Sequence, residues 1–351
     1  MEKISIVSFT GNGTRLCSTV ASELKTLGYE VNAYAMEAYI REPEAGSSIR
    51  PLKVRLKEWT GEQFQDADAI IYIGAVGIAV RAIAPFVKDK TTDPAVIVID
   101  EKARFVIPVL SGHIGGANEL AGELSLSLNS MPVITTATDL NQLFAVDVFA
   151  GKNNLFISNM EYAKRISAAL LRHEKIGFAS DFQIKGILPE QITPELKTEY
   201  GICISLSEKS GPFAKTLNLI PRVITLGIGC RKGKTLEEIE QAVLEALEGQ
   251  GISIHAVRNV ASIDLKSQEK GLVDFCRKYG LEFHTYSSGQ LEAVPGSFSE
   301  SEYVKKVTGT GNVCERAAIL GSSYGRLVQG KTARDGVTVS MARREQVIYF
   351  E

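Results

Sequence analysis

The sequence has no cysteine framework. Its five cysteines are odd in number, far apart and never spaced as a CxxC pair; they are Cys17, Cys203, Cys230, Cys276 and Cys314. Disulfide-stapled domains and zinc ribbons need regular or paired cysteines, so both classes are disfavoured. We expect the protein to work in a reducing cytoplasm.

The sequence also has little net charge. The 39 lysines and arginines nearly cancel the 41 aspartates and glutamates. No overall field therefore draws the protein to nucleic acid or to an anionic membrane, and neither is an expected partner. A charged ligand would have to be held by local groups instead.

No run of residues is suited to cross a bilayer. The most apolar stretch, Ala69–Val87, contains glycines and is interrupted by Arg81 before Pro85. It is too short and too broken for a membrane span. The first residues, Met1–Ser8, have the pattern of a strand rather than of a targeting segment.

What the sequence does contain is a repeated order of elements. Apolar runs at Ile4–Phe9, Ala69–Ile73 and Arg104–Leu110 each end in a glycine turn that leads into a helical pattern. Further strands are expected at Val96–Ile99 and Val133–Thr136. Strands that alternate with helices predict a mostly parallel sheet covered by helices. The turns should then lie at one edge of the sheet and converge on a single cleft.

The chain is too long for one typical domain. The pattern weakens from Leu140 to Leu219, and a new strand at Val223–Ile228 precedes a helix with a capping box at Thr235 and Glu238. We predict an α/β fold: two domains with mostly parallel, helix-covered sheets, joined by a less regular middle region. The expected boundaries are 1–140 for the N-terminal domain, 141–221 for a middle region packed on it, and 222–351 for the C-terminal domain.

The segment Ser111–Glu119 is the richest in chemistry. Its glycines predict a tight turn that exposes backbone amides, and the helix start that follows adds its positive dipole end. Histidine suits proton transfer near neutral pH, and His113 lies in this turn. The residues expected to form an anion site or oxyanion hole here are Ser111, Gly112, Gly115, Gly116 and Asn118. Alternatively, His113 only caps the turn and Glu119 only complements the helix dipole.

Two other turns of the N-terminal domain are weaker candidates for ligand binding. Gly11 and Gly13 follow the first strand, and Gly74 and Gly77 follow a later one, with Arg81 shortly after them. Their amides, together with the arginine, could hold a carboxylate. Arg81 could equally lie in solvent.

The C-terminal domain has a cationic turn at Gly227–Lys234. Arg231 lies there beside glycines and two lysines, ahead of a helix, where a carboxylate or phosphate would be attracted. Cys230 in the same turn is either a nucleophile whose pKa these cations lower or a small buried filler.

Two further segments of this domain are candidates for binding. Gly309 and Gly311 precede a helix for which Asn312 is a predicted cap, and the alternative is that they serve only this cap. Asp264 and Lys266 lie in a polar loop and would either reach a ligand or remain in solvent.

Neither common nucleotide motif is complete. Leu16 stands where the dinucleotide fingerprint requires its third glycine. The turn Gly227–Lys234 lacks the spacing of a phosphate-binding Walker loop. NAD binding and nucleotide hydrolysis are therefore disfavoured.

Two sets of segments resemble the CbiG family of cobalamin biosynthesis, over nearly the whole chain. Ile73–Arg81, continued by Ala84-Pro85, and Leu110–Asn118 look like the N-terminal domain of that family. Leu226–Arg231 and Ala261–Lys266 look like its C-terminal domain, which also occurs alone as CobE.

The resemblance implies hydrolysis of the ring A δ-lactone of cobalt-precorrin-5A, with release of acetaldehyde and formation of cobalt-precorrin-5B. Cobalt would arrive inside the substrate, so neither a cofactor nor a protein metal site is expected. The substrate carries many carboxylates, which amide-rich turns and nearby cations are suited to hold. Our hypothesis is that His113 activates water, with Glu119 or Asp139 orienting its imidazole.

Two other functions stay open. The protein could be a non-catalytic carrier that shelters a reactive tetrapyrrole between enzymes. It could also be a hydrolase or lyase that acts on another carboxylated metabolite through Cys230 or Cys314. Neighbouring enzymes of the pathway, or further copies of this chain, are partners on which the sequence is silent.

Overall fold

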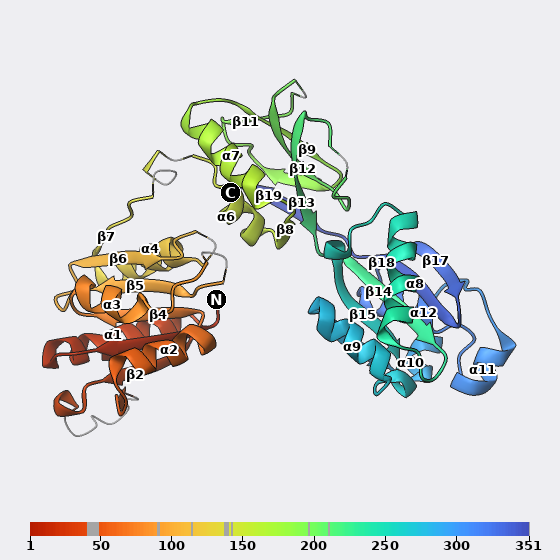
Figure 1. Cartoon of the computed structure of the whole chain (residues 1–351), viewed down its shortest axis with the longest axis horizontal. Coiled ribbons are helices and arrows are strands. Elements are labelled where there is room, and N and C mark those ends of the chain that lie inside the picture. The colour runs from red at the N-terminus through yellow and green to blue at the C-terminus, as the bar shows by residue number, and fades with distance from the viewer. Residues whose placement is uncertain are drawn as a thin grey trace. The chain divides into compact units, whose positions relative to one another are not determined.

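The computed structural model describes residues 1–40, 49–89, 92–113, 115–136, 140–141, 143–195, 197–209 and 211–350. The chain forms two compact units, Met1–Leu143, which runs from red to yellow in Figure 1, and Phe144–Glu351, which runs from green to blue. Within the described residues, no helix is both long and apolar enough to cross a membrane.

A single sheet forms the centre of the N-terminal unit. Its strands are hydrogen-bonded in the order β3-β2-β1-β4-β5-β6-β7. β1 to β5 are parallel, β6 runs antiparallel to β5, and β7 is parallel to β6. The strands are β1 (Lys3–Ser8), β2 (Glu30–Ala35), β3 (Ile49–Pro51), β4 (Ala69–Ile73), β5 (Ala95–Ile99), β6 (Phe105–Leu110) and β7 (Met131–Pro132). The strand expected at Val133–Thr136 is wrong, because those residues are not in a strand and the edge strand β7 consists of the two residues before them.

Helices cover both faces of this sheet. α1 (Gly11–Thr26) and α4 (Ala117–Leu128) pack on one face, and α2 (Leu56–Asp66) and α3 (Val76–Ile83) pack on the other. A short 3-10 turn, η1 (Glu37–Tyr39), follows β2. Every residue of β4 is buried, as expected of a strand whose alternating side chains enter two cores. The predicted sheet, mostly parallel and covered by helices, is confirmed.

The reversal of β6 is the exception to the parallel order. Only residues 100–104 connect β5 to β6, and the Asp100 carboxylate accepts three backbone amides of this segment. A parallel connection needs a crossover of about a dozen residues or more. Because this link is much shorter, β6 has to run antiparallel to β5. The carboxyl end of β6 therefore lies at the opposite edge of the sheet from the carboxyl ends of β1 and β4.

The second unit begins with a smaller sheet, in the order β11-β9-β12-β13-β8, of which β8 alone is antiparallel to its neighbour. Its elements are α6 (Val146–Lys152), β8 (Leu155–Ile157), α7 (Met160–Leu171), β9 (Ile176–Ser180), β11 (Ile192–Thr193), β12 (Tyr200–Ile204) and β13 (Lys215–Pro221). These residues belong to the same compact unit as the C-terminal part of the chain. The packing of the middle region on the N-terminal domain stays a prediction.

A third sheet, in the order β16-β15-β14-β18-β17, completes the second unit. β14, β15 and β16 are parallel, and β17 and β18 form an antiparallel hairpin beside β14. Its strands are β14 (Ile224–Cys230), β15 (Val257–Ile263), β16 (Glu282–Tyr286), β17 (Arg326–Arg334) and β18 (Val337–Arg343).

Helices surround this third sheet. The predicted capping box is confirmed, because Thr235 and Glu238 bond each other's backbone at the start of α8. The elements are α8 (Leu236–Gly249), η2 (Ile254–Ala256), η3 (Asp264–Lys266), α9 (Lys270–Tyr279), α10 (Ser288–Glu292), α11 (Glu302–Thr308) and α12 (Cys314–Gly321).

The last strand returns to the middle region. β19 (Val347–Phe350) pairs in parallel with β10 (Gln183–Gly186). The Asn153 side chain accepts the Tyr349 amide at 2.8 Å and donates to the Tyr349 carbonyl at 3.0 Å. The Phe350 ring stacks on Phe149 with centroids 4.5 Å apart. Residues 347–350 are therefore part of the fold of the middle region, although the sequence separates them from it by the whole C-terminal sheet.

Candidate functional site

The first candidate region is the carboxyl edge of the N-terminal sheet, where β1 and β4 end side by side. α1 follows β1 onto one face of the sheet, and α3 follows β4 onto the other. The edge between them is thus a topological switch point, which is where open α/β sheets bind ligands. Neither helix has an acidic residue of its own in its first turn, although Glu101 reaches the cap of α1, so the positive dipole end of α3 is the less offset of the two.

The turn after β1 is shorter than the sequence indicates. Gly11 and Gly13 lie inside α1 rather than ahead of it. Thr10 caps the helix by accepting the Gly13 amide at 3.0 Å, and its hydroxyl donates to Glu101 at 2.8 Å. The Gly13 amide therefore already donates a hydrogen bond, whereas Gly11 is the first residue of the helix.

The turn after β4 has a similar arrangement. Gly74 has a φ of +157°, and a Cβ there would lie 3.1 Å from the Phe9 ring, so glycine is required at this position. Gly77 lies in the first turn of α3. Arg81 is exposed, and its guanidinium donates to the Gly77 carbonyl at 3.2 Å. Arg81 therefore remains accessible to a carboxylate.

The second candidate region, the Ser111–Gly116 turn, lies at the amino edge of the same sheet. It follows β6, which runs opposite to β1 and β4. The Ser111 hydroxyl donates at 2.9 Å to the carbonyl of Asp93, which stands just before β5. The expectation that the glycine turns of this domain converge with His113 on one cleft is therefore wrong, because the two candidate regions flank opposite ends of the same strands.

Internal hydrogen bonds hold the Ser111–Gly116 turn. The amides of residues 116–118 donate to the carbonyls of residues 111–113, at 2.9 to 3.1 Å. A Cβ at Gly115 would lie 2.4 Å from the Ser111 Cβ, so the turn cannot close around a larger residue. Those three amides are not available to an oxyanion. Of the residues predicted to form the oxyanion hole, Gly112 and Gly115 remain as candidate backbone amide donors.

Polar side chains lie around His113, which is itself half-buried. The Asn118 amide group donates to the Thr136 hydroxyl at 3.1 Å. Glu119 is exposed in the first turn of α4, where it also complements the helix dipole. Asp139, the other residue expected to orient the imidazole, lies outside the described residues. The roles of His113, Glu119 and Asp139 stay predictions.

Asp93 is a buried polar residue that the sequence analysis did not identify. Its carboxylate accepts the Lys88 amide at 2.8 Å, while its carbonyl accepts the Ser111 hydroxyl. Asp93 therefore ties the loop after α3 to the His113 turn. An aspartate followed by proline just before an apolar strand was the available signal, because this pair favours a turn.

The third candidate region is the carboxyl edge of the C-terminal sheet. Arg231 follows β14, and Asp264 and Lys266 belong to η3 after β15, so the parallel strands bring both segments to the same edge. Lys266 is paired with Glu269 at 2.7 Å, and Glu269 also accepts the Gly233 amide at 2.7 Å. The polar loop expected at Ala261–Lys266 is reduced to η3, and Glu269, which was not predicted, joins the two turns.

The glycines of the Thr308–Gly311 segment serve the fold. Gly309 ends α11 with a φ of +79°, and its amide donates to the Lys305 carbonyl at 2.9 Å. The Gly311 amide donates to Glu292 at 3.2 Å. The Asn312 side chain accepts the Glu315 amide at 2.9 Å, as the predicted cap requires. Neither glycine amide is free for a ligand, which favours the helix-cap interpretation.

Cys230 lacks an activated thiol. Partial burial raises its pKa above the ordinary value and outweighs the opposite effect of Lys266 and Lys234. Burial likewise raises the pKa of the Cys314 thiol to about 11. A nucleophilic cysteine needs a lowered pKa, so the hydrolase or lyase that acts through either thiol is disfavoured.

Alkylation gives a direct check. Because both thiols stay protonated at neutral pH, iodoacetamide should modify Cys230 slowly, and a Cys230→Ser variant should keep turnover within about twofold of the parent. Mass analysis of the cysteine peptides beside a turnover assay measures both quantities. Loss of turnover in step with carbamidomethylation of Cys230 would restore the thiol mechanism.

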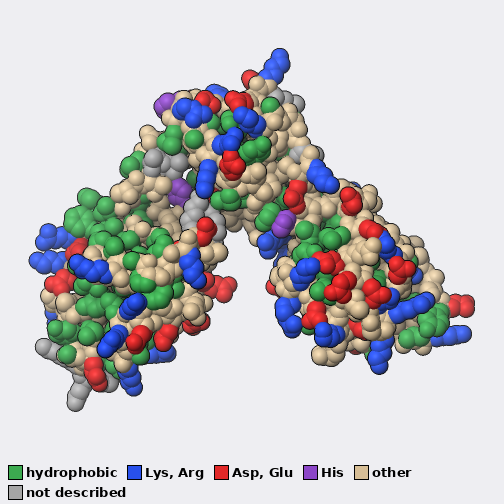
Figure 2. All heavy atoms as spheres, viewed as in Figure 1, with side chains coloured by type: hydrophobic (Ala, Val, Ile, Leu, Met, Phe, Trp, Pro, Cys, Tyr) green, Lys and Arg blue, Asp and Glu red, His purple; other side chains and the backbone are tan. Residues whose placement is uncertain are grey.

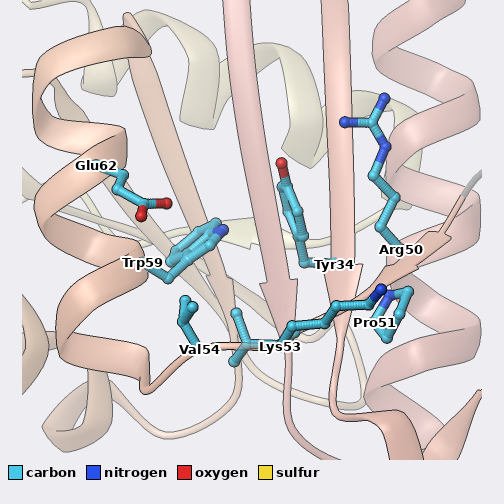
Figure 3. Close-up of a pocket in the computed structure, with 8 residues that line it drawn as sticks. Tyr34, Arg50, Pro51, Lys53, Val54, Trp59 and Glu62 are labelled. Carbon is cyan, nitrogen blue, oxygen red and sulfur yellow. The ribbon is translucent and has the colours of Figure 1, made fainter.

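A cavity of about 400 Å³ lies between α2, the edge strand β3 and its neighbour β2 (Figure 3). Tyr34 and Trp59 line it, with Arg50 and Lys53 as its cations. The buried Trp59 indole nitrogen has no hydrogen-bond partner within the part of the chain that the structure describes, but it points toward Tyr34. The two ring centroids are 5.5 Å apart in an edge-on contact. Its lining includes neither histidine nor cysteine, so we do not place the chemistry in this cavity.

Among the described residues, no group of three or more histidine, cysteine, aspartate or glutamate side chains is arranged to hold a metal ion. The fold and its edges define a protein of the α/β class with several helix starts and cationic turns suited to an anionic ligand.

The chain belongs to the CbiG family of cobalamin biosynthesis. The family models that match are described as Cobalamin synthesis G N-terminal, over residues 58–139, Cobalamin biosynthesis central region, over residues 144–221, and Cobalamin synthesis G C-terminus, over residues 224–342.

Named relatives align with almost the whole chain. Cobalt-precorrin-5A hydrolase of Salmonella typhimurium is 34% identical over 358 residues, which covers 97% of each chain. Cobalt-precorrin-5A hydrolase of Priestia megaterium is 31% identical over 356 residues, which covers 96% of this chain and 94% of the relative. The crystal structure of a cobalamin biosynthesis protein G homologue from Sulfolobus solfataricus is 26% identical, with a TM-score of 0.42, and covers 98% of this chain and 97% of that chain.

Proposed function

We propose that this protein is a cobalt-precorrin-5A hydrolase of anaerobic cobalamin biosynthesis. It opens the lactone on ring A, releases the two-carbon unit as acetaldehyde and yields cobalt-precorrin-5B. The observation that carries this proposal is the 34% identity to a protein of that name over 97% of both chains. A match of this extent includes the turns of both units rather than one shared domain.

The chemistry is assigned to the His113 turn. His113 takes a proton from water, which attacks the lactone carbonyl and breaks its bond to the ring oxygen. The amides of Gly112 and Gly115 are assigned to the oxyanion that develops in this step. The alkoxide freed by ring opening becomes the carbonyl of acetaldehyde as its carbon–carbon bond to the macrocycle breaks, and the imidazolium returns its proton to the macrocycle carbon that receives the electron pair. Glu119 or Asp139 orients the ring, as in other sites where an acid holds a catalytic histidine.

Substrate carboxylates are assigned to the edges of the sheets. In the N-terminal unit, the open start of α1 at Gly11 and the exposed Arg81 are the groups best placed for them. In the second unit, Arg231 is exposed, whereas Lys266 already pairs with Glu269. Cobalt enters and leaves as part of the macrocycle, so the reaction as proposed requires no further cofactor.

A carrier protein would differ from a hydrolase in the fate of the bound tetrapyrrole. A carrier would bind the tetrapyrrole and return it unchanged, while the names of the long relatives are those of hydrolases. This similarity favours catalysis over storage.

The proposal is tested by incubating the purified protein with cobalt-precorrin-5A. We expect acetaldehyde, trapped as its hydrazone, in equal amount to a product that has gained one water and lost one acetaldehyde by mass. The heat-unfolded protein serves as the control for spontaneous opening. Binding of the macrocycle without acetaldehyde release would identify a carrier instead.

A further inference from the structure

The outer face of α3 carries apolar residues and one charged side chain, that of Arg81. Val76 is 37% exposed and Val80 is 44% exposed, and Gly77 and Ala84 are also exposed. Residues at these spacings share one side of a helix. Val87, just beyond the helix end, is 44% exposed as well. We call these five residues the α3 stripe.

This stripe is unusual for a surface helix. The inner face of α3 already packs on the sheet through Ala79, Ala82 and Ile83, so a soluble fold would place polar residues on the outer face. Arg81 is the one polar residue in α3. Hydrophobic side chains also gather in Figure 2 over the part of the N-terminal unit where Figure 1 places α3. Exposed apolar residues that gather on one helix face and are bordered by charges make this face a candidate binding surface.

Gly77 supports the same conclusion. Glycine in a helix costs about 1 kcal/mol relative to alanine. Its φ is not in the left-handed region, and a Cβ at this position would meet only the Arg81 guanidinium, at 3.6 Å. The fold therefore does not require glycine here. The Arg81 guanidinium lies over this position, so a flat ligand whose rim carboxylate binds Arg81 would approach the start of the helix there.

The stripe leads toward the His113 turn. It ends at Val87, and the amide of the next residue, Lys88, donates to the Asp93 carboxylate. The Asp93 carbonyl accepts the hydroxyl of Ser111, which opens the His113 turn. Two hydrogen bonds thus connect the end of the stripe to the residues assigned to the chemistry.

Two cations border the C-terminal part of the stripe, from Val80 to Val87. Arg81 is exposed beside Val80, and Lys88 is exposed next to Val87. A ligand with a flat apolar body and carboxylates on its rim matches this arrangement, because the body would cover the valines while the rim meets the cations.

We infer that the α3 stripe receives one face of the tetrapyrrole macrocycle, with carboxylates of its rim on Arg81 and Lys88, so that the bound ring extends toward His113. This inference rests on the proposed function. It assigns substrate recognition to a helix face of the N-terminal unit, separately from the glycine amides of the neighbouring turns.

The deciding variant is Val80→Asp, which places a charge in the middle of the stripe at an exposed position. Covering this carboxylate with an apolar ring is costly, so KM for cobalt-precorrin-5A should rise by about tenfold or more while kcat stays within about twofold. Arg81→Gln should raise KM by about threefold to tenfold. Leu126→Asp is the matched control, because Leu126 is 87% exposed on α4 of the same unit and lies outside the stripe.

A titration with cobalt-precorrin-5B, followed by macrocycle absorbance, measures binding without turnover. We expect Val80→Asp to weaken product binding by a similar factor and Leu126→Asp to leave it unchanged.

Unchanged KM and product affinity in Val80→Asp would overturn the inference even if the parent releases acetaldehyde. A parent that binds the product at the stripe but releases no acetaldehyde would overturn the proposed function instead. If Val80→Asp alters only the oligomeric mass by light scattering, protein rather than substrate covers the stripe, and the inference is overturned.

Discussion

Replacement of His113 by alanine is expected to lower kcat for cobalt-precorrin-5A hydrolysis by about 10²- to 10⁴-fold, the usual contribution of a general acid or base. KM should change by less than about threefold, because the imidazole acts on water and on the leaving fragment rather than on the rim carboxylates. Circular dichroism of His113→Ala beside the parent checks that the fold is retained.

Two further measurements separate chemistry from structure. Added imidazole should restore part of the activity of His113→Ala, whereas His113→Gln, which keeps a hydrogen-bonding group, should be as inactive as the alanine variant. His284→Ala is the matched control, since His284 is half-buried on β16 as His113 is in its turn, and its ring contacts Glu282. Turnover of His113→Ala within about threefold of the parent would remove His113 from the mechanism.

The strands of the N-terminal sheet could be predicted because their apolar runs are continuous and end at glycines. β4 occupies the range expected for it, Ala69–Ile73, and both of its faces are buried. The helix starts were placed less well. Gly11 and Gly13 were assigned to a turn, but Thr10 caps α1 one residue earlier, and a threonine before glycines is an ambiguous signal.

The arrangement of the site was harder to predict, because it depends on strand direction. An apolar run such as Phe105–Leu110 looks the same in either direction, so the His113 turn was placed at the wrong edge. The length of the connection held the missing information. Five residues between β5 and β6 cannot contain a crossover helix, and this alone requires an antiparallel pair.

The availability of backbone amides could not be predicted at all. The same glycine-rich pattern describes a turn with exposed amides and one whose amides serve its own carbonyls. At Gly309 and Gly311 the partners are Lys305 and Glu292, and the second lies 19 residues away along the chain. Such pairings depend on the tertiary fold. A glycine turn therefore indicates a sharp bend more reliably than it indicates an anion site.

The pairing of β19 with β10 has the same origin and leads to the largest expected effect on stability. Phe350 is 5% exposed, and its ring contacts Phe149, Phe144 and Phe178 at centroid distances of 4.5, 5.9 and 5.2 Å. Phe350→Ala should lower the free energy of unfolding of the Phe144–Glu351 unit by about 3 to 5 kcal/mol, because it removes a buried ring and leaves a cavity. Urea denaturation followed by far-ultraviolet circular dichroism measures this loss.

Tyr349→Ala is the matched control on the same strand. The Tyr349 side chain is 51% exposed, and its backbone bonds to Asn153 do not depend on the ring, so the loss should stay below about 1 kcal/mol. Hydrogen exchange should also quicken in peptides that span 176–186 of Phe350→Ala, since β19 supports β10 there. The single tryptophan, Trp59, lies in the N-terminal unit, so its fluorescence monitors that unit alone. Equal denaturation midpoints for Phe350→Ala and Tyr349→Ala would show that β19 does not hold the middle region together.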